Sequence, residues 1–363
     1  MRIRSFSLVL ISLAVGALPF LEASALAAPR IVYSQYLDGS HRSGIVAIDP
    51  DGSGRRRLSR GRYHFYPRWS PDRTHVAFVH ARYGQPMPTN TTGEISRTLK
   101  VMRADGTRTT SIAEISGDYD WAPGSRRLVF ELDGDLWIAS RDGDEPTRLT
   151  QTPQHEAHPD WAPGGAEIAF TGTSVSTDPL TPGIGGDIFA IPAGGGEVRR
   201  VTTDPGDDFR PRWSPDGTRI AFISTRGHCC DEEIYGSDLF VVGADGTDEL
   251  RLSDDCTWKQ SQDWSPDGSA MVYESHPDDD ACPAPTRYPP LVLVDASAAT
   301  AIDLLPSGRL GGEHPSFSPG GRWIVFSSPG REATTDLFRV RVRDLQVRRV
   351  VANTKTHEVE ADW

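Results

Sequence analysis

Apolar and polar residues follow one another along this chain in a pattern that repeats every 40 to 53 residues. Each repeat has an aromatic residue, a tight turn, an apolar triplet, a second apolar run and an arginine-rich end. A period of this length is typical of propellers and solenoids, and it fits one blade of four short strands. The aromatic residues that open the repeats are Trp69, Trp121, Trp161, Trp213, Trp264, Phe317 and Trp363.

A turn with proline at its second position follows six of these aromatic residues, as in Ser214-Pro215-Asp216-Gly217. Proline presets φ and glycine accepts a backbone conformation that other residues avoid, so strand one is predicted to fold straight back into strand two. Strand two carries the apolar triplets, which are Ile31-Val32-Tyr33, Val76-Ala77-Phe78, Leu128-Val129-Phe130, Ile168-Ala169-Phe170, Ile220-Ala221-Phe222, Met271-Val272-Tyr273 and Ile324-Val325-Phe326.

Two further strands complete each repeat. Strand three begins with aspartate in runs such as Asp187-Ile188-Phe189-Ala190, and a second tight turn leads into a short strand four. An arginine recurs at the start of strand four with the period of the repeat. That recurrence predicts a structural role at the blade edge, and the arginines are Arg57, Arg148, Arg200 and Arg251.

Seven copies of each element predict an all-β, seven-bladed β-propeller of four-stranded antiparallel blades; six blades is the alternative. The chain begins at strand two and ends at strand one. We therefore expect residues 357–363 to pair beside residues 31–34 and close the ring, which removes the exposed sheet edges of an open array.

Residues 1–27 resemble a secretory signal peptide, with Arg2 and Arg4 before an apolar run and Ala25-Leu26-Ala27 as a cleavage site. Its removal takes the formal net charge from -12 to -13, because two arginines and one glutamate are lost. We therefore expect a single propeller domain over residues 28–363, secreted or periplasmic and monomeric. Such an acidic chain is not expected to bind nucleic acid, and no later segment is predicted to insert into a membrane.

All four cysteines fall in one quarter of the chain. They are Cys229, Cys230, Cys256 and Cys282. A bond between neighbours Cys229 and Cys230 would be strained, so we expect two disulfides that join them to Cys256 and Cys282. A metal site is the alternative, although no Cys-x-x-Cys spacing is present.

The connections of an up-and-down blade alternate between two faces. The tight turns between strands one and two and between strands three and four share one face, which we call the turn face. The other, the loop face, receives the long connections, including residues 81–98, 172–186, 224–237 and 275–289, and all four cysteines. Variable loops on a rigid scaffold are where binding is usually found.

Strand one is innermost in a propeller, so the polar residues before each aromatic are predicted to surround the mouth of the central channel. They are His64, Asp118, His155, Glu156, His158, Asp208, Arg210, Lys259, His314, His357, Glu358 and Glu360. The histidines His64, His155, His158, His314 and His357 are candidate ligands of a divalent metal ion. Solvated polar residues without a metal are the alternative. No hydrolase, metalloprotease or phosphate-binding motif occurs in the sequence.

The segments Trp213–Phe222 and Trp264–Tyr273 resemble the WD40-like repeat of the TolB family, and the likeness extends over nearly the whole mature chain. The resemblance implies a periplasmic, non-catalytic propeller scaffold, here without TolB's separate N-terminal domain. The same repeat occurs in prolyl oligopeptidase relatives and in oligogalacturonate lyases. The expected function is thus binding of a protein or cell-envelope partner through the loop face, without catalysis or a cofactor. The alternative is a metal-dependent enzyme, such as a polysaccharide lyase, with histidines at the channel mouth.

Overall fold

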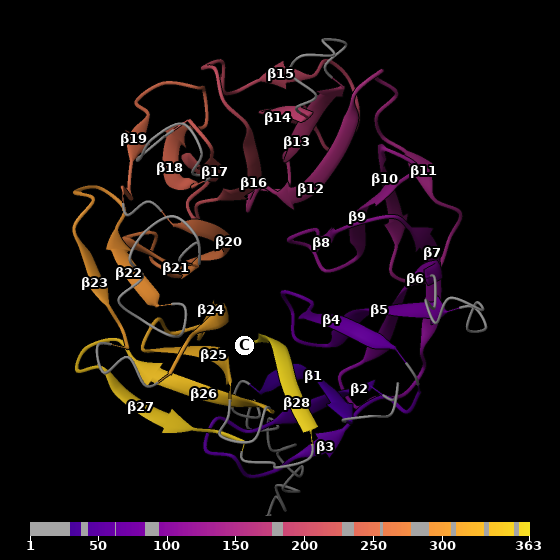
Figure 1. The fold of residues 1–363 in the computed structure, drawn as a ribbon. Coiled ribbons are helices and arrows are strands. Elements are labelled where there is room, and N and C mark those ends of the chain that lie inside the picture. The colour runs from indigo at the N-terminus through magenta and orange to yellow at the C-terminus, as the bar shows by residue number, and fades with distance from the viewer. Residues whose placement is uncertain are drawn as a thin grey trace, which may run out of the picture.

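The computed structural model describes residues 30–37, 43–61, 63–83, 94–175, 184–226, 236–254, 257–276, 290–305, 310–329, 334–351 and 356–363. These residues form seven four-stranded antiparallel sheets, and no helix occurs among them. The sheets surround a central channel as the blades of a propeller (Figure 1). The predicted seven-bladed, all-β propeller is therefore confirmed, and the alternative of six blades is wrong.

We number the blades by their opening aromatic residue and give the strands of each from the channel outward. Blade 1 holds β4 (His64–Trp69), β5 (His75–Tyr83), β6 (Glu94–Arg103) and β7 (Thr110–Ile115). Blade 2 holds β8 (Tyr119–Trp121), β9 (Arg127–Leu132), β10 (Asp135–Ser140) and β11 (Thr147–Arg148). Blade 3 holds β12 (His155–Trp161), β13 (Glu167–Val175), β14 (Ile184–Pro192) and β15 (Arg199–Arg200).

The remaining four blades follow the same order. Blade 4 holds β16 (Asp208–Trp213), β17 (Arg219–Ser224), β18 (Asp238–Gly243) and β19 (Leu250–Arg251). Blade 5 holds β20 (Trp258–Trp264), β21 (Ala270–His276), β22 (Leu291–Asp295) and β23 (Ala301–Asp303). Blade 6 holds β24 (Glu313–Phe317), β25 (Trp323–Pro329), β26 (Thr335–Arg341) and β27 (Gln346–Arg349). Blade 7 holds β28 (Thr356–Asp362), β1 (Ile31–Leu37), β2 (Ser43–Ile48) and β3 (Arg56–Arg57).

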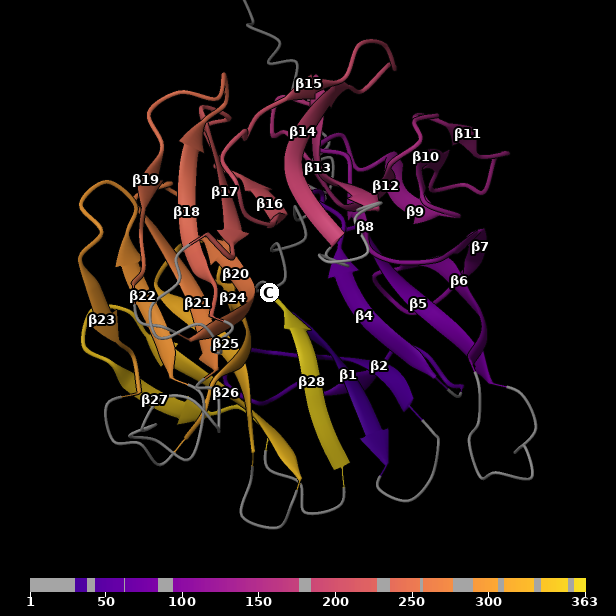
Figure 2. The same ribbon diagram turned by 45° about the horizontal axis from the view of Figure 1, so that its top comes forward.

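Blade 7 closes the ring from both ends of the chain. The last strand, β28, pairs antiparallel with β1, and Ser34 lies opposite Val359. Figures 1 and 2 both show this yellow strand beside the indigo one. Across the seam between blades 6 and 7, Tyr33 and Trp363 share an apolar cluster with Val325 of blade 6. The predicted pairing of the two chain ends is confirmed.

The core lies between neighbouring blades rather than at the centre of the ring. Every residue of the seven triplets is at most 2% exposed. Ile188 of blade 3, for example, packs in one cluster with Trp213 and Phe222 of blade 4. Complete burial of one such side chain is worth about 1.5 to 3 kcal/mol. The apolar face of each sheet is therefore covered by the next blade, which leaves the channel wall free to be polar.

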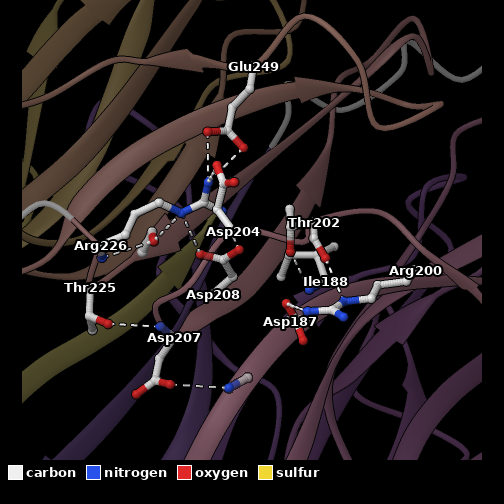
Figure 3. A network of polar contacts seen from close by, with 12 residues as sticks. Asp187, Ile188, Arg200, Thr202, Asp204, Asp207, Asp208, Thr225, Arg226 and Glu249 are labelled. Carbon is white, nitrogen blue, oxygen red and sulfur yellow. Dashed lines mark hydrogen bonds and ion pairs between the residues drawn. The ribbon is translucent and has the colours of Figure 1, made fainter.

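In four blades, an arginine of strand four pairs with the aspartate that begins strand three. Arg200 lies 2.7 Å from Asp187, and Arg251 lies 2.6 Å from Asp238. The pairs Arg148–Asp135 and Arg349–Asp336 repeat the contact in blades 2 and 6. Figure 3 shows the Arg200–Asp187 pair beside Thr202. The predicted structural role at the blade edge is confirmed for Arg148, Arg200 and Arg251, and Arg57 donates instead to the backbone oxygen of Ser59.

Glycine takes the left-handed position of the first turn in four blades, but not in all. Arg73 and Ser125 occupy that position in blades 1 and 2, each with a φ of 58°. Their side chains make contacts that glycine lacks. Arg73 donates to the carbonyl oxygen of Trp363, and Ser125 Oγ accepts a hydrogen bond of 2.9 Å from the backbone of Asp72. Both contacts join neighbouring blades.

Several predictions fall outside the described residues. They are the signal peptide over residues 1–27 and the disulfides of Cys229, Cys230, Cys256 and Cys282. Within the described ranges, the structure contains no helix with the length and apolar character needed to span a bilayer.

Candidate functional site: the central channel

Each inner strand except the short β8 carries a β-bulge before its aromatic residue. In blade 1, Phe65 lies opposite Val79 and Arg68 lies opposite Ala77, so one extra residue is inserted between them. The same shift occurs in β12, β16, β20, β24 and β28. A bulge bends the strand and redirects its side chain.

The residue at the bulge has a positive φ in five blades. Those residues are Tyr66, His158, Arg210, His314 and Glu360, with φ between 51° and 55°. Side chains of a neighbouring blade bind the backbone N–H at four of the five bulges. Glu360 accepts a hydrogen bond from the backbone N–H of Tyr66, and Glu131 accepts one from that of His158. Thr171 and Glu274 do the same for Arg210 and His314. The neighbouring blade thus holds the strained backbone in place. Such strain persists only where the surrounding structure fixes the conformation.

Two rings of side chains line the channel. Each ring takes one residue from every blade, at a fixed distance before the aromatic residue that opens the blade. The bulge ring stands three residues before each aromatic and consists of Tyr66, Asp118, His158, Arg210, Ser261, His314 and Glu360. The carboxylate ring stands one residue before each aromatic and consists of Arg68, Asp120, Asp160, Arg212, Asp263, Ser316 and Asp362. All of these residues border one cavity of about 800 Å³.

The carboxylate ring joins each blade to the next. Asp160 accepts a hydrogen bond of 2.7 Å from the backbone N–H of Trp213, and Asp263 accepts one of the same length from Phe317. Asp120 and Asp362 bind Trp161 and Trp69 in the same way. Burial raises the pKa of Asp263 to about 7. Because their oxygens serve the backbone, we assign these four aspartates a structural role.

The bulge ring is chemically diverse, whereas the residue that follows it is proline in four of the seven blades. Its members are a phenol, two acids, two imidazoles, a guanidinium and a hydroxyl. Tyr66 is 47% exposed and the Asp118 side chain is 44% exposed, although both lie at the innermost strand positions. Arg210 is also exposed. Strand one runs from the loop face to the turn face, so the bulge ring is the ring nearer the loop face.

Two of the five candidate metal ligands, His158 and His314, lie in the bulge ring. The structure places the others elsewhere. His64 is 8% exposed, and its Nδ1 lies 2.7 Å from Ser59 Oγ, so it is part of a contact between blades. His155 is exposed, and His357 lies with its Nδ1 3.3 Å from Thr335 Oγ1.

Burial lowers the pKa of His158 to about 4, so this imidazole is neutral at pH 7. Neutral imidazole is the form that binds metal ions. In the parts of the chain that the structure describes, no three His, Cys, Asp or Glu side chains come close enough together to hold an ion. The metal site stays a prediction.

The other predicted channel residues also divide into two sets. Asp118, Arg210 and Glu360 line the cavity. Glu156, Asp208, Lys259 and Glu358 stand five residues before their aromatic and are 0% exposed. They are buried between blades, so their placement at the channel mouth was wrong. Sequence reasoning missed Tyr66, Ser261 and the carboxylate ring, although a fixed distance from the aromatic residue would have found them.

Proline marks the bulges in four inner strands. Pro67, Pro159, Pro211 and Pro315 each stand two residues before the aromatic. A proline inside a strand pattern indicates an edge or a bulge, because it has no N–H for the ladder. This signal would have told apart the residues that face the channel from those that face the neighbouring blade.

Blade 2 has short connections on the loop face. Only residues 116–118 connect β7 to β8, and only Asp133 and Gly134 connect β9 to β10. Both residues of that turn have a positive φ, 54° and 85°, which is typical of the tightest hairpins. A pocket of about 180 Å³ lies in the channel wall at this point, which we call the notch pocket. Its lining residues are Tyr66, Arg68, Val79, Arg97, Gly117, Asp118, Tyr119, Glu131, His158 and Arg210.

An arginine with three acidic partners lies on the loop face of blade 4. Arg226 follows β17 and is bound by Asp208, by Asp204 at 2.8 Å and by Glu249 at 2.8 Å (Figure 3). Its side chain is 9% exposed and lies 5.1 Å from the ring of Phe240. These contacts hold the chain in place at residue 226, directly before the segment that carries Cys229 and Cys230.

Comparisons with known proteins support the fold. No protein-family model matches the chain. An uncharacterized peptidase, YuxL, of Bacillus subtilis is 28% identical over 32% of this chain and 21% of its own length. The matched segment thus spans about a fifth of that curated relative.

Solved structures are similar over most of the chain. TolB from Acinetobacter baumannii superposes with a TM-score of 0.57 at 17% identity, covering 92% of this chain and 66% of that one. An oligogalacturonate lyase from Vibrio parahaemolyticus superposes with a TM-score of 0.60 at 13% identity, covering 89% and 86%. At this level of identity the likeness concerns the fold. The chain is a β-propeller, and the predicted TolB-like architecture is confirmed.

Proposed function

We propose that this protein is an exported, non-catalytic, TolB-like propeller that binds a protein or another cell-envelope partner through its loop face. The bulge ring at the channel mouth would be the centre of the contact. One observation carries this proposal: a repeated backbone presents five chemical kinds of side chain at the same position of the seven blades. Positions that serve the fold keep the same residue type from blade to blade, as the Ser/Ala-Pro turns do, whereas the bulge ring does not.

Exposure of these side chains supports the same view. Tyr66 and Arg210 stand on strained backbone and reach solvent, although neighbouring positions of their strands are buried. Tyrosine and arginine are enriched among the residues that contribute most to protein–protein binding. A surface of this kind favours recognition over a structural role.

The test is capture of partners from an envelope fraction of the host on the immobilised protein, followed by crosslinking and mass spectrometry. The comparison is between the unchanged protein, the double variant Tyr66→Ala/Arg210→Ala and the control Arg343→Ala. The Arg343 side chain is 77% exposed and lies on the outer part of blade 6. We expect a partner that the protein and the control both retain and that the double variant loses. Equal retention by all three, or no crosslink to the channel mouth, would contradict the proposal.

A metal-dependent enzyme, such as a polysaccharide lyase, is the second candidate. Two observations favour it. His158 and His314 both line the channel, and the Nδ1 atom of each is buried without a hydrogen bond to any described residue. Metal analysis of the purified protein separates the two candidates. A stoichiometric ion that disappears in His158→Ala/His314→Ala, but not in the control His75→Ala, would favour the enzyme.

A further inference from the structure

The outermost strand of blade 6, β27, has an open edge. Its residues are all exposed, and no other described strand pairs with its outer side (Figure 1). The outer strands β3, β11, β15 and β19 have only two residues each, and β7 is longer but partly buried. An unpaired edge offers its backbone N–H and C=O groups to a further strand.

The ladder determines which backbone groups of β27 point outward. Arg348 lies opposite Arg339, and the N–H of Val350, two residues further along, donates to a carbonyl of β26. Hydrogen-bonded pairs alternate along an antiparallel ladder, so Arg348 and Arg339 form one such pair, and the backbone groups of Val347 and Arg349 point away from the blade. A fifth strand would therefore form its hydrogen bonds at Val347 and Arg349.

Two like charges lie directly opposite each other at this edge. The guanidinium groups of Arg339 and Arg348 both lie over the indole of Trp323, at 4.3 and 5.9 Å from the ring centre. Like charges at opposed positions of a sheet destabilise it. The indole offsets part of this repulsion through its π face, but it carries no charge that could balance the pair.

The other arginines of this hairpin have carboxylate partners, whereas these two do not. The partnered pairs are Arg341–Asp344, Arg343–Asp344 and Arg349–Asp336. Arg339 and Arg348 make no hydrogen bond or ion pair with any residue that the structure describes. Asp51 of blade 7 faces Arg339 across the seam, but its Oδ1 accepts two hydrogen bonds from Ser53. The edge thus presents two guanidinium groups, held on one indole, to a carboxylate from outside the chain.

The charge of this edge also excludes a second copy of the chain as the occupant. Residues 339–349 contain five arginines and one acid, although the formal net charge of the chain is -12. Two copies joined at β27 would bring these arginines together, and charged residues on an edge strand prevent pairing of that kind. A strand with carboxylates meets no such repulsion.

We propose that β27 binds an extended acidic segment of a partner protein, which adds to blade 6 as a fifth strand. The residue opposite Arg348 stands in a non-hydrogen-bonded pair, where opposed side chains are closest, so a carboxylate there continues the row of Arg339 and Arg348. Guanidinium groups bind carboxylates through paired hydrogen bonds. Backbone hydrogen bonds supply affinity in such strand addition, and alternate side chains supply specificity. An apolar residue of the added strand would meet Val347, which is 37% exposed.

Partner binding by the loop face does not depend on this edge. The capture experiment changes residues of the channel mouth, whereas the experiment below uses the purified protein, a synthetic peptide and variants of blade 6. Failure of either leaves the other standing.

Fluorescence anisotropy with three labelled peptides tests the charge and the alternation. One peptide alternates glutamate and valine, the second alternates lysine and valine, and the third has the composition of the first with its glutamates in one block. We expect the first to bind at least about tenfold more tightly than the others, because only it places carboxylates on one face of a strand. Equal binding of either control peptide, or no binding at about 1 mM, would overturn the proposal.

Charge variants locate the peptide. Arg339→Gln/Arg348→Gln should weaken its binding by about tenfold or more, whereas Arg343→Gln, in the same hairpin and with its side chain 77% exposed, should change it little. Pyrophosphate tests the rival view that the arginines recognise any oxyanion. Its displacement of the peptide at equal concentration would overturn strand addition, as would equal binding by the two variants.

A proline variant tests the backbone contact. Because the N–H of Val347 points outward, Val347→Pro should break no hydrogen bond within the blade, and proline is accepted on edge strands in that orientation. It removes a donor that the added strand needs, so peptide binding should fall by about tenfold or more. Val347→Ala keeps the N–H and should bind the peptide nearly as well as the unchanged protein. Urea midpoints check that both variants are folded, and unchanged binding in folded Val347→Pro would refute the proposal.

Discussion

Folding moves the carboxyl group of Glu131 out of water. Desolvation and the nearby Asp118 raise its pKa from 4.5 to about 7. A carboxyl group whose pKa rises on folding stabilises the protein while it is protonated, fully so below the unfolded pKa. That contribution is lost as the pH rises through the folded pKa. Between about pH 4.5 and pH 7, the native protein therefore holds a proton that the unfolded chain gives up.

Glu131→Gln should make stability less dependent on pH in this window. Its amide oxygen can still accept the hydrogen bond from His158, and no charge has to be buried. At pH 8 we expect the free energy of unfolding of the variant to be about 1 to 3 kcal/mol larger than that of the unchanged protein, since one pKa unit corresponds to about 1.4 kcal/mol. Urea unfolding from pH 5 to pH 8 measures this. The exposed Glu145→Gln is the control, and equal pH slopes in the two variants would refute the explanation.

Arg226 should be far more sensitive to substitution than the repeated arginines. Its guanidinium is shared by three carboxylates and covered by aromatic rings, and Asp208 beside it is 0% exposed. Arg226→Lys keeps the charge but loses the planar fork, which should cost about 2 to 4 kcal/mol of unfolding free energy.

Arg200→Lys is the matched control, because the Arg200 side chain is 48% exposed. A pair so open to solvent contributes at most about 1 kcal/mol. Denaturant midpoints of the two variants provide the comparison. Equal losses at Arg200 and Arg226 would mean that burial does not determine the contribution of these arginines.

Neighbouring blades are joined by buried charges as well as by apolar clusters. Asp238 begins β18 in blade 4, and Lys259 lies in β20 of blade 5, with Nζ 3.8 Å from the carboxylate. Neither side chain is more than 1% exposed. Arg251 binds the same aspartate at 2.6 Å. The aspartate therefore balances two cations, one from its own blade and one from the next.

Loss of Asp238 should cost more than loss of Lys259. Asp238→Asn removes the carboxylate that lies between the buried ammonium group of Lys259 and the guanidinium of Arg251, and it should destabilise the protein by about 3 to 5 kcal/mol. Lys259→Met leaves the aspartate paired with Arg251 and should cost less. The double variant should be more stable than Asp238→Asn alone. Urea unfolding of the three proteins forms a double-mutant cycle, and strictly additive losses would contradict the coupling.

The whole ring depends on the pairing of β28 with β1. Without that strand, the apolar cluster around Tyr33 and Val325 would lose the Trp363 side chain and would be uncovered on one side. A closed ring has no free inner edge at this blade, whereas an opened one exposes the backbone groups of β1 to other chains.

Removal of residues 356–363 should abolish cooperative unfolding and increase binding of a hydrophobic dye. Trp363→Ala should leave the ring closed and cost about 3 to 5 kcal/mol, as large-to-small changes in a core usually do. Urea unfolding and size-exclusion chromatography distinguish the two outcomes. A truncated protein with an unchanged midpoint and elution volume would show that closure contributes little.

Local patterns were sufficient to predict the propeller. Turn chemistry and apolar triplets such as Ile220-Ala221-Phe222 recur at a fixed period, so blade number and ring closure follow from counting. The channel lining did not follow, because every polar residue shortly before an aromatic residue was assigned to the channel, whichever side of the strand it occupies. The bulge adds one residue there, so Glu156 turns between the blades while His158 turns into the channel. Proline at the bulge was the available signal.

The bulges give this molecule positions that are free to vary. The backbone at Tyr66, His158 or Arg210 is fixed by hydrogen bonds to its N–H and by the ladder around it, and the side chain itself adds little to that framework. Exchange of one such residue should alter the chemistry of the channel mouth while the ring itself persists. Four positions of this kind, at Tyr66, His158, Arg210 and His314, allow the lining of the channel to change by single steps, each nearly neutral for folding.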